Sequence, residues 1–422
     1  MMGVMRYLDY AATTPVLDEV VDAMLPYLRG TFGNPSSVYG VGRDAKKGLE
    51  EARERVAAAV GAVPGEIVFT AGGTEADNLA LKGGAFRARS MRPNGNHIVT
   101  TAVEHHAVLH SAEWLEKQGF RVTFLPVDAE GVVDLDALGS ALGPETVLVS
   151  IMLANNEVGT IQPVDEALRI TRERSRALFH TDAVQALGKI PLNLEKLQVD
   201  MASFAAHKIG GPKGTGALYV RRKTPLEPVL HGGGQERDLR SGTPNVAGIV
   251  GMAAAAEIAA GEVLAEAARL AKLRDRLQAG MVDTIGDVKV NGAGAARVAG
   301  TVNVCIDGVE GESLLLMLDA RGIAASSGSA CTSGSLEPSH VLMAMGVRPE
   351  LAHGSLRLSL GRATTGEDVD AVLDVLPAVV DRLRSIAPSV SARGTAAPPS
   401  PRGTPAPPSP KGAPTSAAAV RR

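Results

Sequence analysis

The sequence predicts an α/β protein: a mostly parallel β-sheet covered by helices on both faces, followed by a smaller α+β domain. Between residues 66 and 220, short runs rich in β-branched and aromatic residues alternate with segments of helical spacing, which is typical of βαβ units. From about residue 262 this regular alternation shifts. The 422-residue chain is 45% hydrophobic and 21% charged, as expected for a globular protein large enough for two domains.

The strands expected in the first half are short apolar runs that end at glycines or at polar clusters. EIVFTA (66–71) ends at Gly72-Gly73, and TEADNLALKGGAF (74–86) then has the spacing of a helix. Further strands are expected at 97–103, 146–153, 178–181, 201–204 and 216–220, and further helices at 107–118 and 165–177.

The second half begins with a charged amphipathic helix and ends in a segment of very different composition. We expect helices at 262–280, 312–322, 338–345 and 366–385, and strands near 287–290, 301–306 and 355–361. Residues 388–422 hold nine prolines, five Lys or Arg and no acidic residue, so they cannot bury enough apolar surface to fold. The predicted organisation is an N-terminal segment (1–14) packing with the small domain, a large domain (15–260), a small domain (261–387) and a disordered tail (388–422).

The overall charge and the cysteine content exclude several classes of protein. The 43 Lys and Arg against 46 Asp and Glu leave a net charge of −3, so neither direct nucleic-acid binding nor an anionic membrane surface is expected. The two cysteines form no CxxC pair and the N-terminus has no signal-peptide pattern, which favours a reducing, cytoplasmic location. The apolar stretch 248–261 is interrupted by Glu257 and predicts a buried helix rather than a membrane span.

Polar residues follow the carboxyl ends of five predicted strands, where ligands bind in open α/β sheets. They are GGTE (72–75), Glu104-His105-His106, Asn155-Asn156-Glu157, Asp182 with Gln185, and His207-Lys208. A glycine turn that opens a helix suits a phosphate, a lysine at a strand end suits a Schiff base, and a carboxylate on another strand suits a pyridinium nitrogen. Together these groups describe pyridoxal phosphate. GGPKGTG (210–216) does not have the spacing of a Walker loop.

Nine motifs in family order carry a resemblance that covers residues 1–385. They are YLDYAATTP (7–15), GNPSS (33–37), AGGTEADN (71–78), EHHAV (104–108), NNEVG (155–159), TDAVQALGK (181–189), AHKIGGPKG (206–214), RSGTPN (240–245) and SSGSACTS (326–333). The chain thereby resembles the cysteine desulfurases, which are fold-type I pyridoxal-phosphate enzymes of the aminotransferase class V superfamily. The long loop around Cys331, about residues 324–338, is similar to that of the first desulfurase group. The resemblance implies a mostly parallel seven-stranded sheet and a homodimer.

The resemblance also implies a role for each residue of the site. Lys208 would form the Schiff base with the cofactor, His105 would stack on its ring and assist proton transfer, and Cys331 would be the nucleophile that takes the sulfur. Asn156 would lie near both cofactor and substrate. The remaining implied contacts are Asp182 to the pyridine nitrogen, Gln185 to the ring hydroxyl, Gly73, Thr74 and His207 to the phosphate together with Thr243 of a second subunit, and Arg357 with Asn34 to the substrate carboxylate.

Two positions depart from the family pattern. The family usually has serine before the Ala-His-Lys run, where this chain has Ala205; one phosphate hydrogen bond is then missing, which weakens cofactor retention by about 1 kcal/mol. The family often has histidine where this chain has Tyr39, which changes the lining of the active-site entrance.

The glycine- and serine-rich sequence around Cys331 suits a thiolate that attacks the substrate sulfur and then carries a persulfide to another protein. Taken alone, Cys331 would be a free cysteine in a tolerant loop, and the other motifs favour the nucleophile. Cys305 alternates with apolar residues and is expected in the core. His106 and His110 have metal-ligand spacing but no third ligand in view, so no resident metal is expected, although Cys331 could transiently hold a nascent iron–sulfur cluster.

The expected substrate is L-cysteine, and the expected partner is a sulfur-acceptor or scaffold protein for iron–sulfur cluster assembly or thio-modification. Two alternatives remain open. One is a related class V enzyme, an aminotransferase or a selenocysteine lyase, in which Cys331 is dispensable. The other is a non-catalytic scaffold, which the intact lysine, aspartate and histidine set argues against.

Overall fold

The computed structural model describes residues 5–327 and 337–386. The predicted tail and Cys331 both lie outside the described residues. The strands are β1 (Arg6–Tyr7), β2 (Ile67–Thr70), β3 (His97–Thr101), β4 (Arg121–Leu125), β5 (Thr146–Ser150), β6 (Leu178–Asp182), β7 (Met201–Ala205), β8 (Gly216–Val220), β9 (Val288–Val290), β10 (Thr301–Ile306), β11 (Ile323–Ala324) and β12 (Ser355–Ser359).

The helices range from single turns to one helix of 39 residues. They are α1 (Asp18–Arg29), α2 (Gly40–Val60), α3 (Gly73–Asn78), α4 (Gly84–Met91), α5 (His106–Lys117), α6 (Leu135–Ala141), α7 (Val164–Arg174), α8 (Leu194–Leu197), α9 (Val246–Thr284), α10 (Gly311–Asp319), α11 (His340–Ala344), α12 (Pro349–Ala352) and α13 (Gly366–Ile386). A π-helical turn, Leu79–Gly83, joins α3 to α4, and 3-10 turns occur at Pro64–Glu66, Ala206–Lys208 and Glu236–Asp238.

The large sheet has seven strands in the order β2-β8-β7-β6-β5-β3-β4. All its pairings are parallel except those of β8, which runs against both of its neighbours. The carboxyl ends of the other six strands therefore share one edge. The predicted fold class is confirmed. Among these strands only β4 was not expected individually, because it is an edge strand with exposed residues such as Arg121 and Phe124.

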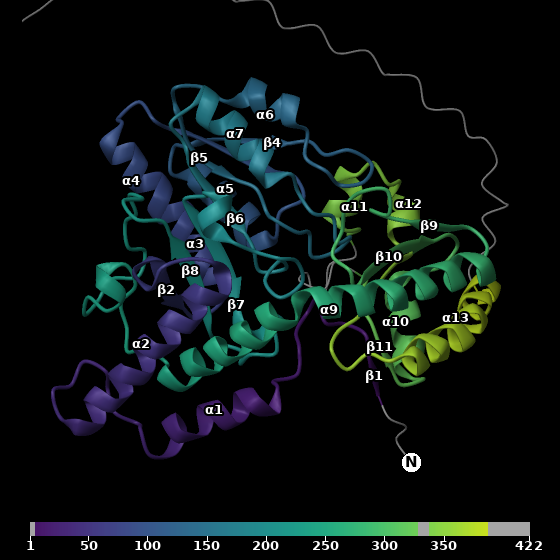
Figure 1. The fold of residues 1–422 in the computed structure, drawn as a ribbon. Helices are drawn as coiled ribbons and strands as arrows, with labels where there is room; N and C mark the ends of the chain where they lie inside the picture. Colours follow the sequence, from purple (N-terminus) through teal and green to yellow (C-terminus); the bar gives the residue numbers. More distant parts are fainter. Residues whose placement is uncertain (1–4, 328–336, 387–422) are drawn as a thin grey trace, which may run out of the picture. The chain divides into compact units, whose positions relative to one another are not determined.

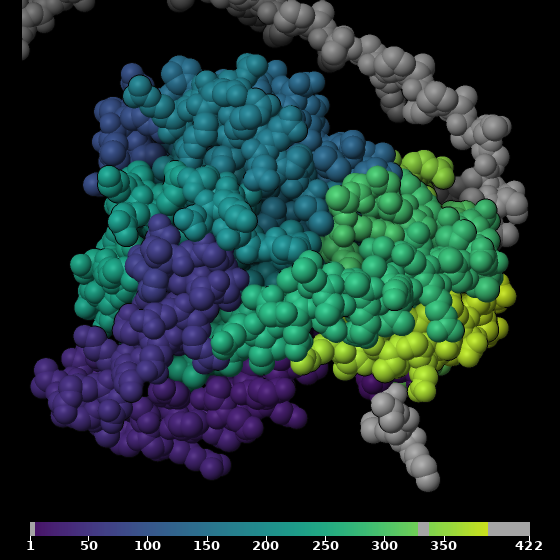
Figure 2. All heavy atoms as spheres, viewed as in Figure 1, coloured from purple at the N-terminus to yellow at the C-terminus, as the bar shows by residue number. Residues whose placement is uncertain are grey.

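Helices cover both faces of this sheet, and the alternation along each strand decides which residues face which helices. Ile67 and Phe69 pack in a cluster with α1, α2, α7 and the first half of α9. Val68, between them, packs in a second cluster with α3, α4 and α5. Figure 2 shows the surfaces of α1 and α2 beside that of α9, in agreement with the contacts between these helices.

The helix α9 is continuous over 39 residues and contacts α1 and α2 at one end and α13 and β10 at the other (Figure 1). Of the described residues, α9 alone is long and apolar enough to cross a membrane, and 67% of its most apolar window is buried inside the protein, as in a core helix. The described residues, 5–327 and 337–386, belong to one compact unit. The predicted boundary at 260/261 falls inside α9 and stays a prediction.

The second half builds a smaller antiparallel sheet, β12-β10-β9, and a two-stranded parallel pair, β1-β11. Leu8 packs with Leu314, Leu356 and Leu376 in a separate hydrophobic cluster of this half. The chain then continues from β1 along β12, where Tyr10 N–H donates to the Ser359 carbonyl at 3.2 Å. This path carries residues 9–14 from the smaller sheet to the edge of the large one.

Candidate active site

The carboxyl-end edge of the large sheet collects one polar group from each of several strands. His105 follows β3, Asn156 follows β5, Asp182 ends β6, and Lys208 follows β7. The sheet order places these four strands side by side as β7-β6-β5-β3. Chain segments far apart in the sequence therefore bring an amine, a carboxyl, an amide and an imidazole to one edge.

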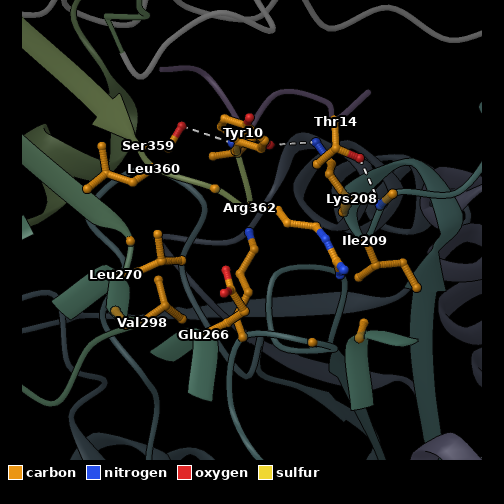
Figure 3. Close-up of a pocket in the computed structure, with 18 of the residues that line it drawn as sticks. Tyr10, Thr14, Lys208, Ile209, Glu266, Leu270, Val298, Ser359, Leu360 and Arg362 are labelled. Atoms are coloured by element: carbon orange, nitrogen blue, oxygen red, sulfur yellow. Dashed lines mark hydrogen bonds between the residues drawn. The ribbon is translucent and has the colours of Figure 1, made fainter. Parts of the chain in front are cut away.

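The side chain of Lys208 lies against the N-terminal segment. Its Nζ donates to the carbonyls of Ala11 and Ala12, both at 2.7 Å. Figure 3 shows Lys208 between Thr14 and Ile209, at the wall of a cavity of about 350 Å³ that Leu270, Val298 and Leu360 also line. Both hydrogen bonds tie this nitrogen to the backbone of the N-terminal segment.

His105 is the N-cap of α5, and its Nδ1 accepts the Ala107 backbone N–H at 3.1 Å. Burial lowers the pKa of His105 to about 4, and the neighbouring Lys208 charge adds to this shift. The imidazole is therefore neutral at pH 7. Because Nδ1 accepts a hydrogen bond, Nε2 carries the proton and can donate it.

Asp182 is buried, and it accepts the Val184 backbone N–H at 2.9 Å. Burial raises the pKa of Asp182 to about 6, and the Lys208 charge partly opposes that rise. Two other acids, Asp77 and Glu104, are equally buried near it, and burial followed by the Asp182 charge raises the pKa of Asp77 well above its usual value. A cation beside Asp182 would restore its charged form.

Gln185 is held at both ends of its side-chain amide. Its Nε2 donates to the Ala11 carbonyl at 2.9 Å, and its Oε1 accepts from Nζ of Lys189. Burial, followed by the charges of Lys208 and Arg357, lowers the pKa of Lys189 to about 7. Lys189 is one of the site residues that sequence reasoning missed, because its position within a recognised motif gave it no chemical role.

The residues expected at a phosphate line a second hollow on the same edge. Gly73, Thr74 and His207 line it together with Thr13 and Lys213. Gly73 leaves no room for a side chain, since a Cβ there would lie 2.7 Å from Cγ2 of Val184. His207 Nδ1 lies 3.1 Å from Thr13 Oγ1, and burial followed by the Lys208 charge lowers its pKa to about 4. Thr13, which contacts His207, is a further residue of the site that the sequence did not suggest.

Arg357 lies on β12 and is only 3% exposed. Its Nη1 donates to the Asn156 carbonyl at 3.0 Å, and its Nη2 donates to Asp9 Oδ1 at 2.7 Å. Arg357, a residue of the smaller sheet, thus contacts Asn156 at the carboxyl-end edge of the large sheet. Asn34 and Thr243 lie elsewhere: they line a separate hollow that includes none of Lys208, Asp182 and Arg357. Their predicted roles stay predictions.

The segment that contains Cys331 lies outside the described residues, but the residues on both sides of it are attached to the site. Before it, Ser326 and Arg357 exchange backbone hydrogen bonds of 3.1 and 2.6 Å. After it, Ser339 Oγ donates to the buried Glu157, and His340 Nε2 lies 2.9 Å from the Glu104 carbonyl. The described residues Ser326 and His340 thus lie close to Arg357 and to Glu104, which precedes His105.

The remaining cysteine and histidines have structural surroundings. Cys305 is fully buried and accepts a hydrogen bond from Asn291 at 3.2 Å, as expected for a core cysteine. The His106 ring lies 5.0 Å from that of His110 and 4.7 Å from that of His340. Over residues 5–327 and 337–386, no group of three or more His, Cys, Asp and Glu side chains is arranged to hold a metal ion.

Comparisons with known proteins agree on one family. Residues 6–372 match the model of the family described as Aminotransferase class-V. The chain is 54% identical over 382 residues to the cysteine desulfurase IscS of Methanosarcina thermophila, covering 90% of this chain and 93% of that protein. It is 52% identical to the enzyme of the same name from Dictyoglomus turgidum, covering 90% and 96%.

Solved structures give the same result. A NifS-like protein superimposes with a TM-score of 0.84 at 42% identity, covering 90% of this chain and all of that one. A structure of SspA in complex with cysteine has a TM-score of 0.73 at 36% identity, covering 84% and 98%.

Proposed function

This chain belongs to the class-V aminotransferase family and is a cysteine desulfurase of the first group, and we propose that it uses pyridoxal 5'-phosphate on Lys208 to take sulfur from L-cysteine. The products are L-alanine and a persulfide on Cys331. The observation that carries this proposal is the meeting of Lys208, Asp182 and His105 at one sheet edge with Arg357 attached beside them.

The residues of this edge fit the cofactor in shape and in chemistry. Gly73 carries no side chain where it borders the second hollow, and Thr74 and His207 line the same hollow, which suits the phosphate. Asp182 is buried and has no cationic hydrogen-bond partner within residues 5–327 and 337–386, so a pyridinium nitrogen would supply its missing counter-charge. When bound, the cofactor withdraws electrons from the substrate α-carbon, which loosens the α-hydrogen and then the carbon–sulfur bond.

The protein's own groups bind the substrate and move its protons. Arg357 binds the substrate carboxylate, because its buried Nε has no partner among the described residues. Lys208 would take the α-proton at its Nζ, and the carbonyls of Ala11 and Ala12 are placed to accept hydrogen bonds from the ammonium that results. The neutral His105 can donate a hydrogen bond from Nε2–H at the substrate, and in this way it would assist proton transfer there.

The sulfur leaves by nucleophilic attack. The thiolate of Cys331 attacks the substrate sulfur, so that a sulfur–sulfur bond forms while the carbon–sulfur bond breaks. The electron pair of the broken bond stays with the carbon, which takes up a proton and becomes the methyl group of alanine. The persulfide then passes to an acceptor or scaffold protein for iron–sulfur cluster assembly or thio-modification.

The decisive experiment follows sulfur and alanine together. Wild-type protein supplied with pyridoxal phosphate and L-cysteine should release alanine and gain one sulfur atom on Cys331, measured by mass spectrometry. Lys208→Ala should lose the visible absorption band of the Schiff base. Cys331→Ala should keep the band and form no persulfide, whereas Cys305→Ala is a matched control that keeps both. Alanine release at the wild-type rate from Cys331→Ala would indicate a related enzyme, an aminotransferase or a selenocysteine lyase.

We further propose a cytoplasmic homodimer in which Thr243 reaches the phosphate of the second copy. The hollow that holds Thr243 and Asn34 supports this arrangement, since neither residue lines the Lys208 cavity of its own chain. Sedimentation of the cofactor-loaded protein tests it, and an active monomer would contradict it.

A further inference from the structure

Residues 9–14, which we call the strap, contact site residues from both sheets. Lys208 Nζ and Gln185 Nε2 donate to carbonyls of the strap, at Ala11 and Ala12 for the lysine and at Ala11 for the glutamine. Thr14 N–H and Oγ1 both donate to the His207 carbonyl, at 2.9 and 3.0 Å. The strap is therefore part of the site rather than only an N-terminal extension of the smaller sheet.

The strap is fixed to the strand that carries Arg357. Ala11 N–H donates to Ser359 Oγ at 2.9 Å. Ser359 and Arg357 are two residues apart on β12, so their side chains project from the same face of the strand. Asp9 meets Arg357 on that face, with Oδ1 2.7 Å from Nη2, and this ion pair is mostly buried, at 3% exposure for the arginine and 17% for the aspartate side chain.

The guanidinium of Arg357 is only partly satisfied. Nη1 bonds the Asn156 carbonyl and Nη2 bonds Asp9, whereas the buried Nε has no partner among the described residues. A buried unpaired N–H is costly, and most such groups in proteins have a partner. Nε and Nη2 together form the side-on edge of the fork that binds a carboxylate. A ligand carboxylate can thus be added at Nε while Asp9 keeps its own hydrogen bond.

We propose that Asp9 is a positioning residue that holds the Arg357 guanidinium so that its Nε edge receives the substrate carboxylate. This inference rests on the proposed function, because it assumes an amino-acid substrate at Lys208. Asp9 acts through Arg357 and not on the substrate amine or sulfur. Removing Asp9 should therefore weaken binding of ligands that carry a carboxylate and leave binding of simple amines unchanged.

The test compares two ligands that differ only by the carboxylate. L-Alanine, the reaction product, and ethylamine both react with the loaded cofactor, and the change in visible absorption with concentration gives an apparent Kd for each. Asp9→Ala should raise the apparent Kd for L-alanine about tenfold, the effect of losing one hydrogen bond to a charged group. Ethylamine should bind equally well to both proteins. For L-cysteine turnover, KM should rise much more than kcat falls.

Asp9→Asn keeps an oxygen acceptor for Nη2 and loses the charge, so its apparent Kd for L-alanine should lie between those of wild type and Asp9→Ala. If Asp9→Ala fails to fold, the apparent Kd of Asp9→Asn alone tests the positioning role of Asp9. Arg357→Lys, which lacks the fork, should lose L-alanine binding selectively. Asp368→Asn is the matched control, because Asp368 also faces an arginine of this region, Arg6 at 3.8 Å, but does not contact Arg357.

The outcomes separate this inference from the proposed function. L-Alanine binding by the Asp9 variants as tight as in wild type, or tighter, would overturn the inference, because Asp9 would then be idle or would compete with the carboxylate. An equal loss of ethylamine and L-alanine affinity would also overturn it, since it would mark a general structural role. A wild-type protein that never develops a visible band with pyridoxal phosphate would instead count against the proposed function.

Discussion

Glu104→Gln should make the protein more stable at alkaline pH than at acidic pH, relative to wild type. Glu104 is fully buried immediately before His105. Its Oε1 accepts from Thr101 Oγ1 at 2.9 Å and from Met152 N–H at 2.8 Å, and its buried Oε2 has no partner among the described residues. Burial, and then the Asp182 charge, raise the pKa of Glu104 to about 8 against a usual 4.5, despite the Met152 and Thr101 hydrogen bonds.

The sign of the effect follows from proton linkage. Because the folded pKa is raised, the folded protein keeps a proton that the unfolded chain loses above pH 4.5, and stability falls as pH rises until the carboxyl ionises near pH 8. Each pH unit between the unfolded and the folded pKa lowers the free energy of unfolding by about 1.4 kcal/mol. Wild type should therefore lose about 3 kcal/mol through this one group between pH 6 and pH 9.

Glutamine at position 104 does not titrate, so the substitution removes this pH dependence. It also lowers the stability by an amount that is the same at both pH values. The glutamine oxygen can accept the same two hydrogen bonds, but its amide N–H groups replace Oε2 at a buried position, which costs about 1–3 kcal/mol at either pH. The cost cancels when the effect of the substitution at pH 9 is compared with its effect at pH 6. Only the proton-linked term, about 3 kcal/mol in favour of the variant at pH 9, remains.

Urea denaturation of wild type and Glu104→Gln at pH 6 and at pH 9 gives the free energy of unfolding of each protein at each pH. The effect of the substitution at pH 9 minus its effect at pH 6 is the double difference. Other titrating groups are common to the two proteins and cancel in the same way. A double difference below about 1 kcal/mol, or one that favours wild type at pH 9, would show that Glu104 is already ionised in the folded protein at pH 6.

Three further predictions concern the surroundings of the site. Glu236→Ala should lower the free energy of unfolding by about 3 kcal/mol, since Arg53, 4% exposed and 2.7 Å from that carboxylate, keeps the neutral Ile67 carbonyl and, among the described residues, only the solvent-exposed Glu50 as a charged partner; a loss below 1 kcal/mol in urea denaturation, about the value of a surface pair, would contradict it. Lys189→Met should stabilise the protein most at pH 6, because the lowered pKa of Lys189, about 7, makes its charge costly there; a gain that grows towards pH 9 would refute the sign. Ala205→Ser should slow cofactor loss on dialysis about fivefold by restoring one hydrogen bond, whereas unchanged retention would show that the family serine is dispensable here.

The fold class and many site residues were predictable from the sequence. The parallel sheet follows from buried apolar runs such as Thr146–Ser150 that alternate with helical segments. The residues His105, Asp182 and Lys208 follow from their places directly after such runs, because the carboxyl ends of parallel strands share one edge. These inferences need only local periodicity and the topology of the sheet.

The contacts of the strap were decided by the tertiary structure alone. Asp9 and Arg357 are separated by 348 residues and meet only because β12 brings them together. Ala11 and Ala12 act through backbone carbonyls, which every residue possesses, so no sequence pattern could distinguish them. The same holds for the raised pKa of Glu104 and the lowered pKa of Lys189, because desolvation depends on how completely the rest of the chain surrounds a group rather than on its sequence neighbours.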